Sequence, residues 1–342
     1  MITKTSLQKL FQLNNKIKIP LYRQIIKNII ENIHNNNLSI GDKLPSINSI
    51  CKEFNLSRDT VVKSYDILKE KGIITAVHGK GFYINNSRSE IKTNVFVLFD
   101  AQHTSYKEEL FKGMQEVVKD KASLDIYSHH YNPIFFRDLI TKYRNDYEYY
   151  VIMPFKNKLV EESLKKLDPK KVLLLDIAIS TKKTDYSSIF QSHDFGFENA
   201  LGDALDSIRK YKKLFLVYPQ EKHHPISTKN SFLKFCQQNG IEYQVEHDLD
   251  ESLLQKNNAY FVIEDDDLVS LIKYCRKMNF KLGKDIGCLT YNDTPFKTIL
   301  EGGITTVSID FYQMGKLVGK QICRPVQINT VVPTYLFKRK SL

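Results

Sequence analysis

The feature that most constrains the fold of this 342-residue chain is an alternation of short apolar runs with helical patterns over about its last 250 residues. The candidate strands are residues 95–99, 124–127, 149–153, 172–175, 214–218, 243–245, 260–263, 286–290 and 305–309. The helical segments between them include residues 108–119, 198–209, 228–238, 267–277 and 311–322. Several runs are continuously apolar, as buried parallel strands are, so the pattern predicts doubly wound α/β structure.

The number of candidate strands suits two sheets better than one. In folds of this kind, ligands bind beyond the carboxyl ends of the parallel strands. Any ligand site is therefore expected at the loops that follow the apolar runs.

The first 84 residues differ, because three helical patterns are followed there by a short β segment. The polar stretch 85–93 is expected to be a linker. The chain has a net charge of +11, and residues 1–90 hold 14 Lys and Arg against 7 Asp and Glu. This small terminal part thus carries +7 of the excess. A basic charge concentrated in this way indicates a nucleic-acid partner.

Residues 44–69 have the pattern of a helix-turn-helix, in which two short helices are joined by a tight turn. Ser46 is a candidate cap for the first helix, and Ser57 is a candidate cap for the second. Arg58 and Thr60 lie outside the apolar stripe of the second helix. Side chains at such positions meet base edges and phosphates when a recognition helix enters the major groove.

Two short strands, 73–77 and 82–84, follow the second helix and are joined by His78-Gly79-Lys80-Gly81. A glycine-rich, basic hairpin tip can reach a minor groove or the phosphates. A P-loop is excluded, because that motif needs G-x-x-x-x-G-K-[ST] between a strand and a helix.

Four motifs fall in order with matching spacing: Pro20-Leu21-Tyr22-x-Gln24-Ile25, Gly41-x-x-Leu44-Pro45-Ser46, Leu56-Ser57-Arg58-x-Thr60-Val61 and Gly79-Lys80-Gly81. Together they resemble the winged helix-turn-helix domain of the gluconate-repressor (GntR) family over residues 18–84. Asn48 stands where that family often has an arginine. The resemblance implies that DNA is contacted by Ser46, Ser57, Arg58, Thr60, Lys63, His78, Gly79 and Lys80.

Later motifs are Gly283-x-Asp285-Ile286-Gly287-Cys288-Leu289-Thr290-Tyr291-Asn292-Asp293, Ile304-Thr305-Thr306-Val307-Ser308-Ile309-Asp310-Phe311 and Ser188-Ile189-Phe190-Gln191-Ser192-His193-Asp194-Phe195-Gly196. They are similar to the effector domain of lactose- and ribose-repressor proteins, which share the fold of periplasmic sugar-binding proteins.

This resemblance implies an effector-binding and dimerisation domain at 94–342, after a DNA-binding domain at 1–84. It also implies three crossovers between lobes, expected near residues 190, 292 and 326. The expected lobe 1 is 94–190 and 293–325, and the expected lobe 2 is 191–292 and 326–342.

By their places at strand ends and crossovers, ten residues are expected to contact the effector: Asp100, Tyr106, Phe155, Asp176, His193, His224, Glu264, Asp265, Asn292 and Phe311. Acidic and amide groups suit the hydroxyls of a sugar, and aromatic rings suit its C–H faces. The alternative is a structural role. Asp176 and Asp265 would then cap a helix or loop, and Phe155 and Phe311 would be core aromatics.

The sequence has no G-x-S-x-G, H-E-x-x-H or Cys–His signature, so no enzymatic activity is expected. Its five cysteines form no C-x-x-C pair, so neither a metal site nor a cofactor is expected. No run approaches the ~18 apolar residues of a membrane span. With no signal peptide visible, a cytoplasmic location and reduced cysteines are expected.

The leading hypothesis is a cytoplasmic homodimeric transcription regulator that binds operator DNA and responds to a sugar or sugar derivative, with genes of carbohydrate uptake or catabolism as targets. The alternative is a solute-binding sensor module without DNA-binding activity. The sequence leaves open the effector, the operator, and whether the protein represses or activates.

Overall fold

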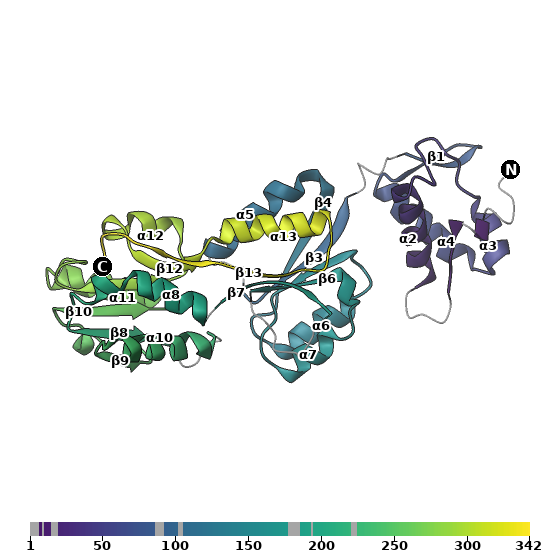
Figure 1. The fold of residues 1–342 in the computed structure, drawn as a ribbon. Coiled ribbons are helices and arrows are strands. Elements are labelled where there is room, and N and C mark those ends of the chain that lie inside the picture. The colour runs from purple at the N-terminus through teal and green to yellow at the C-terminus, as the bar shows by residue number, and fades with distance from the viewer. Residues whose placement is uncertain are drawn as a thin grey trace. The chain divides into compact units, whose positions relative to one another are not determined.

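The computed structural model describes residues 7–8, 10–14, 20–85, 92–101, 105–176, 185–192, 194–219 and 224–342. The chain divides into two compact units (Figure 1). The first comprises Met1–Asn94 with Asp120–Ser123, and the second comprises Val95–Lys119 with Leu124–Leu342.

The first unit is a winged helix. Its elements are α2 (Leu21–His34), α3 (Ile47–Phe54), α4 (Arg58–Glu70) and the antiparallel strands β1 (Ile74–Val77) and β2 (Gly81–Ile84). Ser46 and Ser57 cap α3 and α4, which confirms both predicted caps: their side chains accept hydrogen bonds from Ser49 N and Thr60 N.

The core of the first unit lies between the helices and the wing. Tyr65 of α4 is buried, its hydroxyl donates to Pro45 O at 2.7 Å, and its ring packs edge-on against Phe82 of β2. The chain before α2 also joins this core. Phe11 is 2 % exposed and packs against Phe54, a contribution that the sequence analysis did not identify.

The second unit contains two six-stranded sheets within the described residues. The first sheet has the order β13-β7-β6-β5-β3-β4 and the second β14-β12-β11-β10-β8-β9. The strands are β3 (Thr93–Phe99), β4 (Ala122–Ser128), β5 (Tyr149–Ile152), β6 (Val172–Asp176), β7 (Ser187–Gln191), β8 (Lys213–Val217), β9 (Tyr243–Glu246), β10 (Asn258–Val262), β11 (Gly287–Tyr291), β12 (Thr305–Ile309), β13 (Asn329–Val332) and β14 (Thr334–Phe337). We call the part built on the first sheet lobe 1 and the part built on the second sheet lobe 2.

The helices of the second unit cover the faces of these sheets (Figure 1). The α-helices are α5 (Ser105–Val118), α6 (Pro133–Tyr143), α7 (Lys158–Leu164), α8 (Phe195–Asp203), α9 (Leu205–Ile208), α10 (Ile226–Asn239), α11 (Asp265–Lys277), α12 (Pro295–Ile299) and α13 (Phe311–Cys323). Short 3-10 turns are η1 (Lys119–Lys121), η2 (Pro169–Lys171), η3 (Glu251–Leu253) and η4 (Leu300–Gly302). The predicted fold class, a winged helix followed by a two-lobed α/β unit, is confirmed.

The predicted assignment of segments to lobes was wrong in two places. β12 pairs with β11 and β14 in the second sheet, so the chain stays in lobe 2 beyond residue 292 and crosses at Asp310. β13 pairs with β7 in the first sheet, so the third crossover lies at Pro333 rather than near residue 326. An apolar run gives no sign of which of two similar sheets it joins, and this is the physical reason for the error.

After the crossover at Asp310, α13 packs against α5 in lobe 1 (Figure 1). The two backbones approach closely at Gly113 and Gly315. A Cβ atom on Gly113 would collide with Tyr312 O, and one on Gly315 would collide with Leu110 O. No helix among the described residues is long and apolar enough to span a bilayer.

Candidate nucleic-acid interface and inter-lobe site

The N-terminal turn of α4 carries an exposed polar cluster. The hydroxyls of Ser57 and Thr60 lie 2.7 Å apart, and Arg58 Nη1 donates to Asn48 Oδ1 of α3 at 2.7 Å. Asn48, the position that departs from the family pattern, therefore orients Arg58. The guanidinium remains exposed, so its other N–H groups can reach the edges of bases.

Two further predicted DNA contacts lie on the same two helices. Ser46 caps α3 and is exposed, and its hydroxyl lies 2.7 Å from that of Ser49. Lys63 lies one to two turns along α4 from Ser57, and its ammonium is 4.2 Å from the centre of the Tyr22 ring. The ring holds the cation close to the helix surface.

The other predicted DNA contacts, His78, Gly79 and Lys80, form the exposed turn between β1 and β2. Lys80 N donates to Val77 O at 3.0 Å and closes the turn. Gly79 has φ +69°, and no atom lies within 4 Å of the position a Cβ would take. The backbone at Gly79 is thus open to solvent between His78 and Lys80.

In the second unit, polar residues gather where strands of the two sheets end. Asp100, at the end of β3, forms an ion pair with Lys107 of α5 and accepts from the Tyr131 hydroxyl at 2.5 Å. Lys107 is only 5 % exposed. Burial alone would raise the pKa of Asp100, but Lys107, Tyr131 and the Ala101 N–H hold it below its ordinary value.

Asp176 ends β6 with a left-handed backbone, at φ +74°. Gln191 Nε2 donates to Asp176 Oδ1 at 2.6 Å, and the Tyr291 hydroxyl of lobe 2 donates to Gln191 Oε1 at 3.2 Å. Burial and the charge of Asp100 raise the pKa of Asp176 to about 6. We call Asp100, Lys107, Tyr131, Asp176, Gln191 and Tyr291 the inter-lobe cluster.

Glu264 precedes α11 in lobe 2 and belongs to the same region. Burial raises the pKa of the Tyr131 hydroxyl, and the charges of Asp100, Asp176 and Glu264 raise it further. Three of the predicted effector carboxylates, from both lobes, thus raise the pKa of one half-buried phenol.

Phe155 forms part of an aromatic group beside this cluster. Its ring stacks on His129 at 5.0 Å and meets Tyr131 edge-on at 5.6 Å. His129 Nε2 lies 2.9 Å from Met153 O, and its Nδ1 accepts from Tyr131 N. Burial lowers the pKa of His129, so the neutral ring is favoured and donates from Nε2.

Asn292 follows β11 in the left-handed conformation, at φ +59°. Its Oδ1 is buried and accepts no hydrogen bond from the described residues. The ammonium of Lys297, a residue only 1 % exposed, donates to the carbonyls of Tyr291 and Asn292 at 2.9 Å and pairs with Asp265 at 2.8 Å. The predicted effector residue Asp265 therefore neutralises a buried lysine.

The remaining predicted effector residues lie at several places. Tyr106 and Phe311 pack at 4.6 Å between ring centres, at the starts of α5 and α13. Phe311 also lines a shallow groove of about 270 Å³ at the second crossover. His224 packs edge-on against Tyr291 at 5.0 Å. His193 lies outside the described residues.

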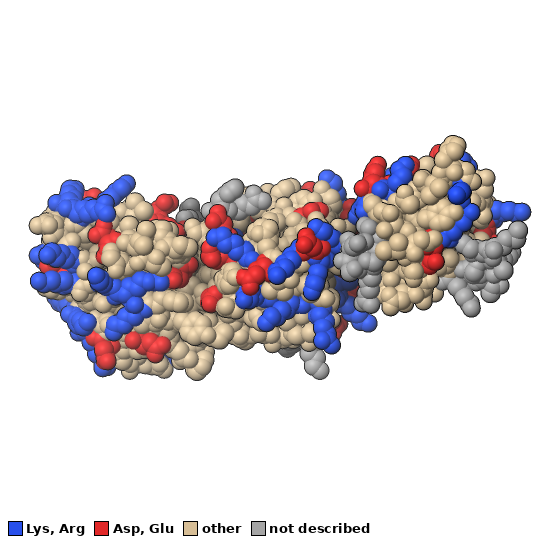
Figure 2. All heavy atoms as spheres, turned by 90° about the horizontal axis from the view of Figure 1, so that it is seen from above, with Lys and Arg blue, Asp and Glu red and all other residues tan. Residues whose placement is uncertain are grey.

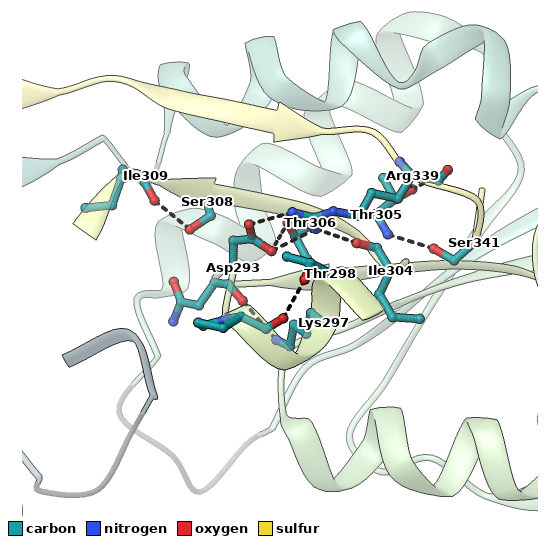
Figure 3. Close-up of polar contacts among 12 residues, drawn as sticks. Asp293, Lys297, Thr298, Ile304, Thr305, Thr306, Ser308, Ile309, Arg339 and Ser341 are labelled. Carbon is teal, nitrogen blue, oxygen red and sulfur yellow. Dashed lines mark hydrogen bonds and ion pairs between the residues drawn. The ribbon is translucent and has the colours of Figure 1, made fainter. Parts of the chain in front are cut away.

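Asp293, the neighbour of Asn292, is bound within lobe 2 (Figure 3). Arg339 donates to both of its carboxylate oxygens, at 2.8 and 2.7 Å, and also to Ile304 O at 2.7 Å. Thr306 donates to the same carboxylate at 2.9 Å. These hydrogen bonds connect the segment around Arg339, which follows β14, with β12 and the loops beside it.

Sequence reasoning missed several residues of this region: Lys107, His129 as a packing residue, Tyr131, Gln191, Tyr291, Lys297 and Arg339. One signal was available for the segment around Tyr131. Asn132 caps α6 and Pro133 opens it, a pair typical of a helix start, yet α6 was not predicted. The buried lysines had no such signal, since lysine in a helical pattern indicates an exposed face.

Residues 1–90 carry +7 of the chain's net charge of +11, and the rest of the chain is nearly balanced. Figure 2 shows basic and acidic side chains interspersed over the second unit. No group of His, Cys, Asp and Glu suited to a metal ion occurs among the residues that the structure describes.

Comparison with known proteins gives matches for both units. The family model of the bacterial regulatory proteins, gntR family, matches residues 21–84. The YtrA HTH-type transcriptional repressor of Bacillus subtilis is 32% identical over 101 residues, which cover 30% of this chain and 73% of YtrA. The Escherichia coli repressor MngR, of mannosyl-D-glycerate transport and metabolism, is 36% identical over 91 residues, 27% of this chain and 35% of MngR.

Other curated relatives are matched over a smaller share of their own length than YtrA is. The B. subtilis regulator YdfD is 33% identical over 111 residues, 32% of this chain. The chain spans between 23% and 35% of the length of YdfD, YydK and MngR. Each of these likenesses covers about a third of this chain or less.

Solved structures match the two-lobed unit. The trehalose repressor from E. coli has a TM-score of 0.61 at 12% identity and covers 72% of this chain and 100% of its own. The lactose repressor bound to the anti-inducer ONPF has a TM-score of 0.61 at 16% identity, covering 72% of this chain and 99% of its own. At these identities the likeness establishes the shared fold.

The pKa of Asp176 predicts a pH dependence of stability. The unfolded chain loses this proton near pH 3.8 and the folded chain near pH 6, so ionisation of Asp176 opposes folding. The contribution of Asp176 to the free energy of unfolding therefore falls as the pH rises from about 4 to 6. Asp176→Asn should remove this fall in the free energy of unfolding, which is about 3 kcal/mol for pKa values of 3.8 unfolded and about 6 folded. Denaturant unfolding at pH 4, 5, 6 and 7 measures the difference.

Asp250→Asn is the control, because Asp250 is an exposed carboxylate whose pKa is lowered by the Ser252 N–H. This substitution should not reproduce the effect. Identical pH profiles for the wild type and Asp176→Asn would contradict the assignment.

Proposed function

The chain belongs to the gntR family of bacterial regulatory proteins, and on that basis we propose that it is a transcription regulator whose operator binding responds to a small effector. The first unit binds operator DNA, and the second binds the effector between its lobes. A cytoplasmic location follows from this activity.

The observation that carries the DNA-binding proposal is the exposed polar cluster at the start of α4. The hydroxyls of Ser57 and Thr60 are hydrogen-bonded to one another, and the exposed Arg58 donates to Asn48 of α3. A recognition helix presents such residues to base edges and phosphates from its N-terminal turn. Lys63 and the wing residues His78 and Lys80 add donors for phosphates on the same unit.

The effector proposed is a sugar or sugar derivative. The inter-lobe cluster contains carboxylates, which accept hydrogen bonds from sugar hydroxyls, and an amide, which can also donate to them. The rings of Tyr131 and Phe155 beside it suit the C–H faces of a sugar. The names of MngR and of the trehalose and lactose repressors point to carbohydrate genes as targets.

Arg58→Ala should weaken specific operator binding at least about fivefold, since a bidentate arginine contact contributes about 1–3 kcal/mol of base discrimination. The operator is selected by the wild-type protein from a random duplex library. Fluorescence anisotropy over a series of salt concentrations then gives the specific and non-specific affinities.

Arg209→Ala is the matched control, because Arg209 is an exposed arginine of the second unit. It should bind the operator as the wild type does. A wild-type footprint for Arg58→Ala would exclude the recognition-helix assignment, and failure of the wild-type protein to enrich any duplex would favour the sensor module without DNA activity.

Asn292→Ala should weaken effector binding by more than about 1 kcal/mol, because its buried Oδ1 would lose a hydrogen bond from an effector hydroxyl. The effector is found by thermal shift of the full chain against monosaccharides and their phosphates, since a ligand of the folded state raises Tm. Calorimetry compares the variants. Asn239→Ala, at the half-buried end of α10 in the same lobe, is the control. Equal affinities for Asn292→Ala and the wild type would reject the role.

A homodimer is proposed as the form that binds DNA, because two winged helices related by two-fold symmetry fit a pseudo-palindromic operator. The face of α11 and α12 supports this proposal. Ile299 is 79 % exposed, and Phe296 and Val269 are also exposed. Exposed large apolar side chains favour burial against a partner.

Ile299→Asp should shift the chain from dimer to monomer in sedimentation velocity at micromolar concentration, because it would place a carboxylate in an apolar interface. Ile134→Asp, on α6 of lobe 1 and also exposed, should remain dimeric. A dimeric Ile299→Asp would exclude this face, and a monomeric wild type would exclude the homodimer.

A further inference from the structure

A side-chain hydrogen bond joins the two lobes in addition to the crossovers. Gln191 ends β7 in lobe 1 and is 6 % exposed, and Tyr291 ends β11 in lobe 2 and is 3 % exposed. The Tyr291 hydroxyl donates to Gln191 Oε1 at 3.2 Å. Two sheets that share no backbone pairing are thus bonded at the ends of two of their strands.

The amide of Gln191 can face only one way in this arrangement. Its Nε2 donates to Asp176 Oδ1 at 2.6 Å, so its Oε1 is left for Tyr291. A phenol has one O–H, and here that hydrogen is directed at Gln191. The bonds therefore form a chain with a fixed direction, from Tyr291 in lobe 2 through Gln191 to Asp176 in lobe 1.

Breaking this chain has a cost, since the groups are buried. A buried donor or acceptor left without a partner costs about 1–3 kcal/mol. Water that entered to satisfy these groups would need space between the lobes. The bonds are consequently favoured at one separation of the two strand ends.

Gln191 also lies between two of the three crossovers. Ser192 directly follows it on the first crossover, and Gln191 is paired in the sheet with Val332, which precedes Pro333 on the third. A change in the angle between the lobes must turn the backbone on both sides of this residue.

We propose that Gln191 is a positioning residue that holds the two lobes at one relative angle through its bonds to Asp176 and Tyr291. Its regulatory meaning rests on the proposed function: an effector hydroxyl bonded to Asp176 would compete with the Gln191 amide and so change the bond between lobes. A ligand shifts such an equilibrium only when it binds the two arrangements with different affinity.

The test measures the distance between lobes directly, by electron spin resonance on the full chain without DNA or effector. One spin label is placed on Cys323, an exposed native cysteine at the end of α13 in lobe 1. The second is placed on an engineered cysteine, Lys284→Cys, at an exposed position of lobe 2. Cys51→Ser removes the partly exposed thiol of the first unit, and the other cysteines are buried.

In this background a single narrow distance distribution is expected. Gln191→Leu, which removes both hydrogen bonds at similar volume, should broaden or shift it. Tyr291→Phe removes only the hydroxyl and should change it in the same direction. Tyr243→Phe is the control, since it removes a tyrosine hydroxyl bonded to Gln237 within lobe 2, and its distribution should match that of the parent.

Unchanged distributions in Gln191→Leu and Tyr291→Phe would overturn the proposal, even if both lowered Tm, because a merely structural bond would affect stability alone. If Gln191→Leu fails to fold, Tyr291→Phe decides. The distance measurements do not involve operator binding. If they contradict this proposal, the assignment as a transcription regulator still stands. If operator binding fails instead, the distances still test whether Gln191 positions the lobes.

Discussion

The architecture of the second unit depends on one continuous segment near the end of the chain. β13 completes the edge of the first sheet beside β7, and after Pro333 β14 completes the edge of the second beside β12. The forked bond of Arg339 to Asp293 then fixes the segment beyond β14 to lobe 2. A single stretch of backbone thus pairs with both sheets, and the relative placement of the strand ends follows from it.

The charges of the inter-lobe cluster are a consequence of that placement. Bringing the ends of β3 and β6 together sets Asp100 near Asp176, and the opposing lobe adds Glu264. Lys107 neutralises Asp100, while Asp176 is left with amide hydrogen bonding and a raised pKa. Two like charges in a partly buried site favour donors that reduce their repulsion. A polyhydroxy effector supplies such donors without introducing a charge.

Much of the fold could be predicted from the sequence, because its signals are local. Ser46 and Ser57 each precede an apolar stripe and cap the helix expected there. β7, β13 and β14 were not predicted as strands: they contain polar residues, and the last two are edge strands, which need fewer apolar side chains than central ones. The crossover at Asp310 was misplaced because β12 is as buried as its neighbours, and burial does not identify the sheet.

The candidate DNA interface could be predicted from local sequence signals, whereas the contacts of the inter-lobe site could not. The proposed DNA contacts Ser57, Arg58 and Thr60 lie at the start of a single helix, α4, so spacing alone places them together. The inter-lobe bond joins residues 100 positions apart, Gln191 and Tyr291, and although each lies in a motif, no motif shows that the two side chains meet. Contacts of this kind are specified by the topology of both sheets together. A family motif can identify the strand ends where an effector site should form, but which side chains bond across the lobes depends on how the two sheets are joined.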